Sequence, residues 1–451
     1  MRSTRFFERF TKKTGIGELM DDMGRAMQGQ IDMRMLGGGN PAHIPEVNEI
    51  WRRRTEEILS NGAELEETLA NYDTPQGKQA FLESLATLLS REYGWKLDAE
   101  NIAVTNGSQS ATFLLLNILS GTDAEGSMNR VLFPLCPEYI GYADQTVERG
   151  ALVTRPAKIE ETRDHFFKYR VDFDNLEMDG DISALCASRP TNPTGNVLTD
   201  SEIFGLARIA AEKGIHFLID SAYGAPFPNI LFKDVRPYWD ENVILSMSLS
   251  KLGLPSVRTG IVVASKEVIN ALSAANAVTS LANGSFGQVL VRPLIDSGDI
   301  LALSKDVIQP FYEKRSQIAV ETLIEAFGDD IPFRIHEPEG SIFLWVWLPG
   351  LPIGSAQLYE RLKDRGVLVV SGHYFFYGLE SARGGPREES PEARMFREHS
   401  ERCLRISYAP DPAVFREAAL IMADEVRRVM EESGAGNAST TEAVPSGNAA
   451  K

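Results

Sequence analysis

The hydrophobic positions of the 451-residue chain follow two patterns, one before and one after about residue 310. In the first part, short continuous apolar runs alternate with stretches in which apolar residues recur every three to four positions. Such runs are typical of strands buried on both faces of a parallel sheet. The intervening stretches are typical of the helices that connect those strands. The predicted strands are 102–105, 131–134, 184–187, 216–219, 243–247 and 260–264.

The connecting helices are also visible in the pattern. Residues 201–213 place Ile203 and Leu206 on one helical face, and Thr199 or Asp200 is suited to cap the helix start. After Pro310 the pattern changes to mixed helices and strands, predicted at 311–326, 341–348, 355–365, 367–370, 404–408 and 412–432. We therefore predict an α/β protein with a large, mostly parallel sheet domain and a smaller α+β domain.

The domain boundaries follow from the same change of pattern. Residues 1–49 are predicted to form an N-terminal arm and part of the small domain, 50–312 the large domain, and 313–432 the small C-terminal domain. Residues 433–451 are rich in small and polar residues, lack the bulk for a core, and are predicted to be disordered. The basic N-terminus is interrupted by Glu8, which favours an amphipathic arm packed on the protein over a targeting peptide.

Charge and composition exclude several classes of function. The net charge of −17 has the wrong sign for binding nucleic acid or an anionic membrane. No window approaches 18 uncharged apolar residues, and the three cysteines are far apart, so we expect a reduced, cytoplasmic protein without a disulfide framework. The six histidines are scattered, and we predict no metal site.

The lysine at position 251 is the first candidate for chemistry. It follows the predicted strand 243–247 among apolar and hydroxyl residues. Burial lowers the pKa of a lysine toward the neutral amine, which attacks aldehydes. Ser248 and Arg258 add a hydroxyl and a guanidinium suited to a phosphate. Taken alone, Lys251 is better explained as a lysine that extends from a strand end to solvent, and its neighbours weaken that interpretation.

Three upstream segments, each after a predicted strand, would complete a site for a phosphorylated aldehyde. Residues 105–111 (Thr-Asn-Gly-Ser-Gln-Ser-Ala) lead into a helix predicted over 111–119, whose N-terminal N–H groups can bind phosphate. Residues 189–195 carry Asn-Pro and Gly. The third segment is 217–224, in which Asp220 ends an apolar strand at the edge of the sheet where ligands bind. A carboxylate there can keep a pyridinium nitrogen protonated. An ordinary turn or helix cap is the alternative for each segment.

Together these motifs, in this order, resemble the class I and II aminotransferases, which are fold-type I enzymes that depend on pyridoxal 5′-phosphate. The resemblance extends from Leu36 to the last predicted helix. It implies a homodimer with shared active sites. Four stretches are similar to a narrower group that exchanges amino groups between valine and pyruvate, namely 36–42, 72–78, 137–142 and 365–376.

The resemblance implies a role for each candidate residue. Lys251 forms a Schiff base with the cofactor and later moves the substrate proton, while Asp220 pairs with the pyridine nitrogen. Asn192 and Tyr223 hydrogen-bond the 3-oxygen of the ring, and Tyr139 stacks on its face. The phosphate is held by Gly107, Ser108, Gln109, Ser248 and Arg258, with Tyr72 added from a second subunit.

The substrate carboxylate has its own predicted partner. Arg405 binds it bidentately, with Gly39 and Asn192 nearby. Other interpretations stay open: Tyr72 and Tyr139 fit partly buried aromatic residues, and Arg405 a structural ion pair. Arg258 follows Lys251 by seven positions where many class I members have eight, which we interpret as a feature of the narrower group.

These roles predict an aminotransferase that acts on an aliphatic amino acid of the valine or alanine type and a 2-oxo acid such as pyruvate. One methylene is worth only about 1–3 kcal/mol in such a pocket, so a specialised biosynthetic substrate stays open. A lyase or amino-acid oxidase of the same fold is a further alternative, because Lys251 and Asp220 serve either chemistry. His373 lies in the stretch 365–376, and the sequence assigns it no role.

Overall fold

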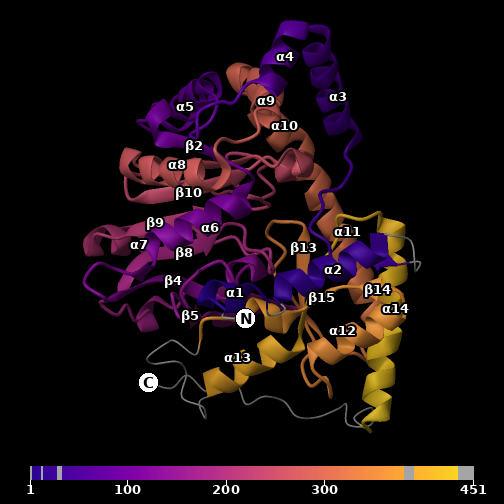
Figure 1. Cartoon of the computed structure of the whole chain (residues 1–451). Helices are drawn as coiled ribbons and strands as arrows, with labels where there is room; N and C mark the ends of the chain where they lie inside the picture. Colours follow the sequence, from indigo (N-terminus) through magenta and orange to yellow (C-terminus); the bar gives the residue numbers. More distant parts are fainter. Residues whose placement is uncertain (1–2, 12–13, 28–32, 380–390, 435–451) are drawn as a thin grey trace.

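The computed structural model describes residues 3–11, 14–27, 33–379 and 391–434. The tail predicted to be disordered is 433–451, and its residues 435–451 lie outside the described residues. The larger of the two main sheets has the strand order β2-β11-β10-β9-β8-β4-β3, with β5 beside β4 (Figure 1). Its strands are β2 (Ile102–Thr105), β3 (Gly121–Thr122), β4 (Met128–Cys136), β5 (Leu152–Pro156), β8 (Ile182–Ser188), β9 (His216–Asp220), β10 (Val243–Ser248) and β11 (Gly260–Val263).

All six predicted strands of this region are present, and the sheet is mostly parallel as predicted. β11 runs antiparallel to both of its neighbours, β10 and β2. The strands β3 and β5 have no counterpart in the prediction. β3 has two residues, and β5 carries Thr154 and Arg155, so neither forms a continuous apolar run.

Helices cover both faces of the large sheet, and successive strand residues alternate between them. On β10, Val243 and Leu245 belong to one apolar core, while Ile244 belongs to the other. The first core includes α5 (Gln79–Tyr93), α7 (Asp200–Lys213) and α9 (Phe286–Ser297), and the second α6 (Ser108–Leu119) and α8 (Lys266–Ser280). Burial on both faces explains why these strands are mostly continuous apolar runs instead of alternating apolar and polar residues.

The second sheet has the strand order β15-β16-β13-β12-β7-β6. Its strands are β6 (Lys158–Arg163), β7 (Phe166–Arg170), β12 (Arg334–His336), β13 (Phe343–Trp347), β15 (Val370–Ser371) and β16 (Cys403–Ser407). The hairpin β6–β7 comes from the middle of the chain and joins this sheet through parallel pairing of β7 with β12. The sequence pattern did not predict the hairpin, because β6 is charged and mostly exposed.

The remaining helices are α3 (Pro45–Ser60), α4 (Gly62–Ala70), α10 (Asp299–Leu303), α11 (Gln309–Phe327), α12 (Ser355–Asp364), α13 (Pro391–Arg402) and α14 (Pro412–Glu432). Of these, α3 and α4 pack against α9, while α11, α12, α13 and α14 pack around the second sheet and the adjoining strand pair (Figure 1). α14 has the predicted bounds, and α11 and α12 differ from prediction by one or two residues. The predicted strand 367–370 is divided into β14 (Val367–Leu368) and β15, and β14 pairs with β1 (Arg34–Met35) near the N-terminus.

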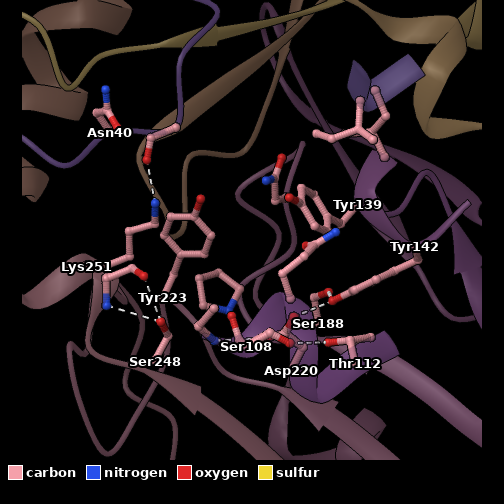
Figure 2. Close-up of a pocket in the computed structure, with 18 of the residues that line it drawn as sticks. Asn40, Ser108, Thr112, Tyr139, Tyr142, Ser188, Asp220, Tyr223, Ser248 and Lys251 are labelled. Carbon is pink, nitrogen blue, oxygen red and sulfur yellow. Dashed lines mark hydrogen bonds between the residues drawn. The ribbon is translucent and has the colours of Figure 1, made fainter. Parts of the chain in front are cut away.

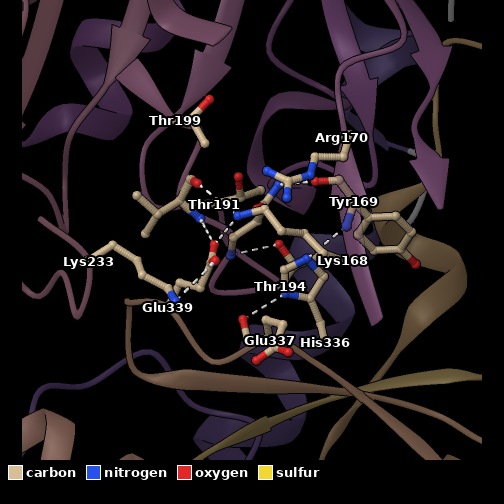
Figure 3. A network of polar contacts seen from close by, with 12 residues as sticks. Lys168, Tyr169, Arg170, Thr191, Thr194, Thr199, Lys233, His336, Glu337 and Glu339 are labelled. Carbon is tan, nitrogen blue, oxygen red and sulfur yellow. Dashed lines mark hydrogen bonds and ion pairs between the residues drawn. The ribbon is translucent and has the colours of Figure 1, made fainter. Parts of the chain in front are cut away.

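A buried ion pair joins the second sheet to the segment that follows Asn192 (Figure 3). Lys168 on β7 pairs with Glu339, and both side chains are almost fully buried. The Lys168 ammonium also donates to the carbonyl oxygen of Val197 over 3.2 Å, and the Val197 N–H donates to Glu339 over 3.1 Å. The pair therefore fixes the backbone beyond the Asn-Pro-Thr-Gly turn against the second sheet.

The N-terminal arm forms the helices α1 (Arg5–Thr11) and α2 (Gly15–Met27). α2 lies against the second sheet and its helices: the Tyr374 hydroxyl donates to Glu18 over 2.8 Å, and Lys363 donates to Asp22 over 2.9 Å. The predicted packing of this arm on the protein is confirmed. Over the described residues, no helix combines the length and the apolar character needed to cross a membrane.

Candidate active site

A cavity of about 260 Å³ lies where the carboxyl ends of β9 and β10 meet the second sheet and α2 (Figure 2). Eleven of the predicted site residues line it: Gly39, Ser108, Gln109, Tyr139, Asn192, Asp220, Tyr223, Ser248, Lys251, Arg258 and Arg405. These residues come from both halves of the chain. The fold thus brings together residues that are more than 300 positions apart in the sequence.

Lys251 lies in the short 3₁₀ turn that follows β10 and points into the cavity (Figure 2). Its Nζ donates a hydrogen bond to the carbonyl oxygen of Gly39 and lies 5.0 Å from the centre of the Tyr223 ring. Burial, together with the positive charges of Arg405 and Arg258, lowers the pKa of Lys251 to about 7. A substantial fraction of this lysine is therefore a neutral amine, the nucleophilic form, near neutral pH.

Asp220 is the last residue of β9 and faces the same cavity. Its Oδ1 accepts a hydrogen bond from the Ala222 N–H over 2.8 Å, and its Oδ2 accepts one from the Tyr142 hydroxyl. Burial raises the pKa of Asp220, while these two hydrogen bonds act in the opposite direction. The side chain is thus fixed by two donors on the protein side and open to a third donor from the cavity.

The start of α6 forms a corner of hydrogen-bond donors beside Asp220. Gly107 precedes the helix with φ of 88°, and no side chain caps the helix N-terminus. A Cβ atom at Gly107 would lie 2.1 Å from the Arg258 guanidinium, so only glycine lets that arginine approach the backbone so closely. The helix begins at Ser108, three residues earlier than predicted, and its first N–H groups, Arg258 and the Ser248 hydroxyl border one corner of the cavity.

Arg405 lies on β16, lines the cavity and is 2% exposed. Its Nη1 donates to Asn192 Oδ1 over 2.8 Å and its Nη2 to the Gly37 carbonyl oxygen over 2.7 Å. The guanidinium carbon lies 4.1 Å from the ring centre of Phe343 and 5.3 Å from that of Phe375. Its pKa is lowered to about 10 by burial. No carboxylate of the described chain pairs with it, so the structural ion pair considered from the sequence is absent from these residues.

Two tyrosines stand beside the cavity. Tyr223 is buried and packs its ring edge-on to Phe343, at 5.9 Å between ring centres. Tyr139 packs edge-on to Tyr142, at 5.1 Å. Burial raises the pKa of both side chains, so each hydroxyl keeps its proton and is a hydrogen-bond donor at neutral pH.

Two predicted residues do not line the cavity. Gly107 lies directly behind Ser108, where its conformation starts the helix. Tyr72 is 83% exposed and contributes nothing to the cavity of its own chain. Its expected contribution from a second subunit stays a prediction. His373 lies elsewhere, in a surface depression with Tyr359, where it contacts the Ser371 hydroxyl at 2.7 Å.

The sequence prediction missed the apolar residues of the cavity and a set of polar residues behind Asp220. Ile16, Leu19 and Met20 of α2 line the cavity, as does Ile140. Their spacing at positions 16, 19 and 20 is that of one helical face, which was the available signal. Tyr142 and Ser188 also line it, and nothing in the local sequence distinguishes them from core residues.

Comparison with known proteins agrees with this geometry. Residues 36–419 match the family model described as aminotransferase class I and II, and the chain belongs to this family. It is 44% identical over 430 residues to the valine–pyruvate aminotransferase of Escherichia coli K12, across 95% of this chain and 99% of that protein.

Solved structures show the same fold. A putative amino-acid aminotransferase from Psychrobacter arcticum 273-4 is 43% identical with a TM-score of 0.89, covering 96% of this chain and 99% of that one. Valine–pyruvate aminotransferase from Salmonella typhimurium LT2 is 43% identical with a TM-score of 0.82, covering 93% and 100%. An aspartate aminotransferase from Thermus thermophilus, 20% identical with a TM-score of 0.73, shares the fold-type I architecture alone. The predicted fold class and enzyme class are confirmed.

Proposed function

We propose that this aminotransferase moves the amino group of valine to pyruvate, forming alanine and the 2-oxo acid of valine, with pyridoxal 5′-phosphate as its cofactor. The observation that carries the proposal is the arrangement of charge in the cavity. Among the described lining residues, the lysines and arginines are Lys251 in the turn after β10, Arg258 beside Gly107 at the start of α6, and Arg405 on β16. One each is suited to the cofactor aldehyde, the cofactor phosphate and the substrate carboxylate.

The residues present fit the cofactor. A partly buried lysine with lowered pKa suits its aldehyde, and the glycine corner at Gly107 with Arg258 suits its phosphate. Asp220 faces the position expected of its ring nitrogen, at the carboxyl edge of the sheet. Bound pyridoxal phosphate supplies a conjugated ring that accepts the electron pair released when the substrate α C–H bond breaks.

The chain itself orients the substrate and moves the proton. Arg405 offers a planar fork to the α-carboxylate, and its position between Phe343 and Phe375 prevents it from turning away. Asn192 and Tyr223 line the same cavity and would serve as hydrogen-bond partners for a ring oxygen. The Lys251 amine, neutral near pH 7, is the base that takes up a proton at Nζ and returns it.

The apolar part of the cavity supports valine as the donor. Ile16, Leu19 and Ile140 provide aliphatic contacts and exclude water from one side. The three cations are assigned to the cofactor aldehyde, the cofactor phosphate and the substrate α-carboxylate. The described lining has no fourth lysine or arginine for a second substrate carboxylate. A dicarboxylic amino acid would leave that charge unpaired in the cavity, which is costly.

We further infer a homodimer in which Tyr72 of each subunit reaches the phosphate corner of the other. The high exposure of Tyr72 on its own chain supports this arrangement, because large aromatic side chains left in solvent are typical of interfaces. The domain division at about residues 49, 312 and 432 stays a prediction.

Alanine formation tests the proposed reaction. Purified protein is supplied with pyridoxal phosphate, L-valine and pyruvate, and alanine is measured by chromatography. We expect alanine formation from valine and pyruvate to be much faster than glutamate formation from aspartate and 2-oxoglutarate. The Lys251→Ala variant should form no alanine. A preference for the dicarboxylic pair would contradict the substrate assignment. Ammonia release from valine without any 2-oxo acid would indicate a lyase or oxidase instead.

A further inference from the structure

A second carboxyl group, Glu138, lies behind Asp220 and is fully buried. It follows β4 and is held by backbone donors: the Ser188 N–H donates to Oε1 over 2.9 Å and the Tyr139 N–H to Oε2 over 3.1 Å. Within the part of the chain that the structure describes, no lysine, arginine or histidine forms an ion pair with Glu138. A buried, uncompensated carboxylate is costly, so the site favours a neutral acid.

Two hydroxyl groups connect Glu138 to Asp220. Glu138 Oε2 lies 2.7 Å from Ser188 Oγ, which lies 3.3 Å from the Tyr142 hydroxyl. That hydroxyl is in turn hydrogen-bonded to Asp220 Oδ2. The result is a row of four oxygen-bearing groups with three contacts between them, and β8 and β9 place Ser188 and Asp220 side by side in register.

The number of hydrogen atoms decides whether the row is satisfied. If both carboxyl groups are ionised, the two hydroxyls supply two hydrogen atoms for three contacts, and one pair of oxygen lone pairs faces without a hydrogen. One added proton fills the third contact, so that every group in the row donates in the same direction. All three contacts are therefore hydrogen bonds only when the row carries one proton in addition to the two hydroxyl hydrogens.

The two ends of the row differ in how well they can bear the remaining charge. Asp220 faces the cavity, where solvent or a bound ligand can donate to it, whereas Glu138 is sealed from solvent. The proton is therefore more stable on Glu138, and the negative charge on Asp220. In agreement, burial raises the pKa of Glu138 to about 7. The titratable groups that face Glu138 are Cys136, Tyr142, Cys186, Asp220 and Tyr377, and none of them is a cation.

We propose that Glu138 is a positioning residue that carries the proton of a relay through Ser188 and Tyr142, and so holds Asp220 as a carboxylate aimed into the cavity. In this relay Glu138 donates a hydrogen bond to Ser188, Ser188 donates to Tyr142 and Tyr142 donates to Asp220. No proton moves from one group to the next. The role of Asp220 toward the cofactor rests on the proposed function, whereas the protonation of Glu138 is a property of the chain alone.

Infrared spectroscopy of the apoprotein tests the protonation directly. At about pH 6, below the pKa of about 7, we expect the carbonyl band of a protonated carboxylic acid in the wild type. Glu138→Gln removes this band, Asp220→Asn retains it, and Ser188→Ala shifts it because the acid loses its acceptor. Glu425→Gln is the matched control, since Glu425 is a buried glutamate paired with Arg361 and Arg365 and lies outside the row.

The same variants separate a neutral from a charged role in the holoenzyme. Glutamine at position 138 can donate to Ser188 as a neutral acid does, so Glu138→Gln should restore most of the rate that Glu138→Ala loses, which we expect to be about tenfold. If Glu138 acts as a carboxylate, glutamine fails as alanine does.

Three results would overturn the relay: loss of the acid band in Asp220→Asn instead of Glu138→Gln, absence of any such band, or equal loss of rate in the glutamine and alanine variants. Failure of Lys251 to take up cofactor would instead remove the proposed function and leave the infrared result intact. The two ideas are thus tested separately.

Discussion

The guanidinium of Arg405 donates a 2.8 Å hydrogen bond to the side-chain oxygen of Asn192, although the two residues are 213 positions apart. Arg405 belongs to the second sheet and Asn192 to the turn after β8 of the large sheet. The contact therefore connects a group expected to bind substrate with one expected to bind the cofactor ring, across the boundary between the two sheets.

Arg405→Lys should weaken substrate binding more than it slows the bound substrate. Lysine keeps the charge but loses the planar fork, and a charge-assisted hydrogen bond is worth about 1.5–3 kcal/mol. We expect the KM for valine to rise about 10- to 100-fold in steady-state kinetics. Arg402→Lys is the control, because Arg402 hydrogen-bonds the Leu351 carbonyl oxygen and lies outside the cavity. An unchanged KM in Arg405→Lys would show that this arginine does not bind the carboxylate.

Lys251 and Asp220 were predictable as site candidates because each lies at the carboxyl end of a strand with a strong local pattern. Asp220 ends a continuous apolar run and Lys251 follows another, so the edge of the sheet at which they lie could be located before any tertiary contact was known. The α6 corner was predictable in the same way, although its start lay three residues earlier because Gly107 leaves the helical conformation.

The rest of the site depends on packing between distant segments. Tyr142 contacts Asp220 across 78 positions, and its run Ile140 to Tyr142 carries no periodic signal. α2 reaches the cavity because Glu18 meets Tyr374, a contact across 356 positions. The hairpin β6–β7 was missed for a different reason: its charged outer strand is stabilised by pairing with β7 and not by burial.

Leu19→Ala should reduce the preference for valine over alanine as amino donor. Leu19 is nearly buried and lines the cavity, so its truncation removes apolar contact that only the larger substrate side chain can use. A lost contact of one or two methylenes corresponds to about 1–3 kcal/mol, or a fall of about tenfold in the ratio of kcat/KM for the two donors. Leu69→Ala, at an exposed position on α4, should leave the ratio unchanged. If the ratio of kcat/KM in Leu19→Ala equals that in Leu69→Ala, the valine side chain does not contact Leu19.

Lys251 should react as an amine with a pKa near 7 in the apoprotein. Its pKa is lowered from 10.5, so its neutral fraction and its rate of acylation should rise as the pH increases through about 7. Arg258→Gln removes one positive neighbour and should move the midpoint to higher pH. Competitive labelling with an amine-selective reagent, followed by peptide mass spectrometry, measures the midpoint. The internal control is Lys266, whose pKa is raised by its hydrogen bonds to Asp98 and Glu100. A midpoint for Lys251 near 10.5 would contradict the described surroundings.

The buried pair of Lys168 and Glu339 should be costly to break on one side only. Lys168→Met leaves a buried carboxylate and Glu339→Leu a buried ammonium, and each should destabilise the apoprotein by about 3–5 kcal/mol. The double variant Lys168→Met with Glu339→Leu should be more stable than Lys168→Met alone, because no charge is left unpaired. Calorimetric unfolding of the apoproteins measures the order of stability of the wild type and the variants. A double variant whose loss equals the sum of the two single losses would show that the charges are not coupled.

The most direct test of the account is the attachment of pyridoxal phosphate to Lys251. The protein is reconstituted with pyridoxal phosphate, reduced with borohydride, digested and examined by mass spectrometry. We predict a single modified peptide, carrying the added mass at Lys251, and loss of the modification when valine converts the enzyme before reduction. Modification at another lysine, or none at all, would contradict the account.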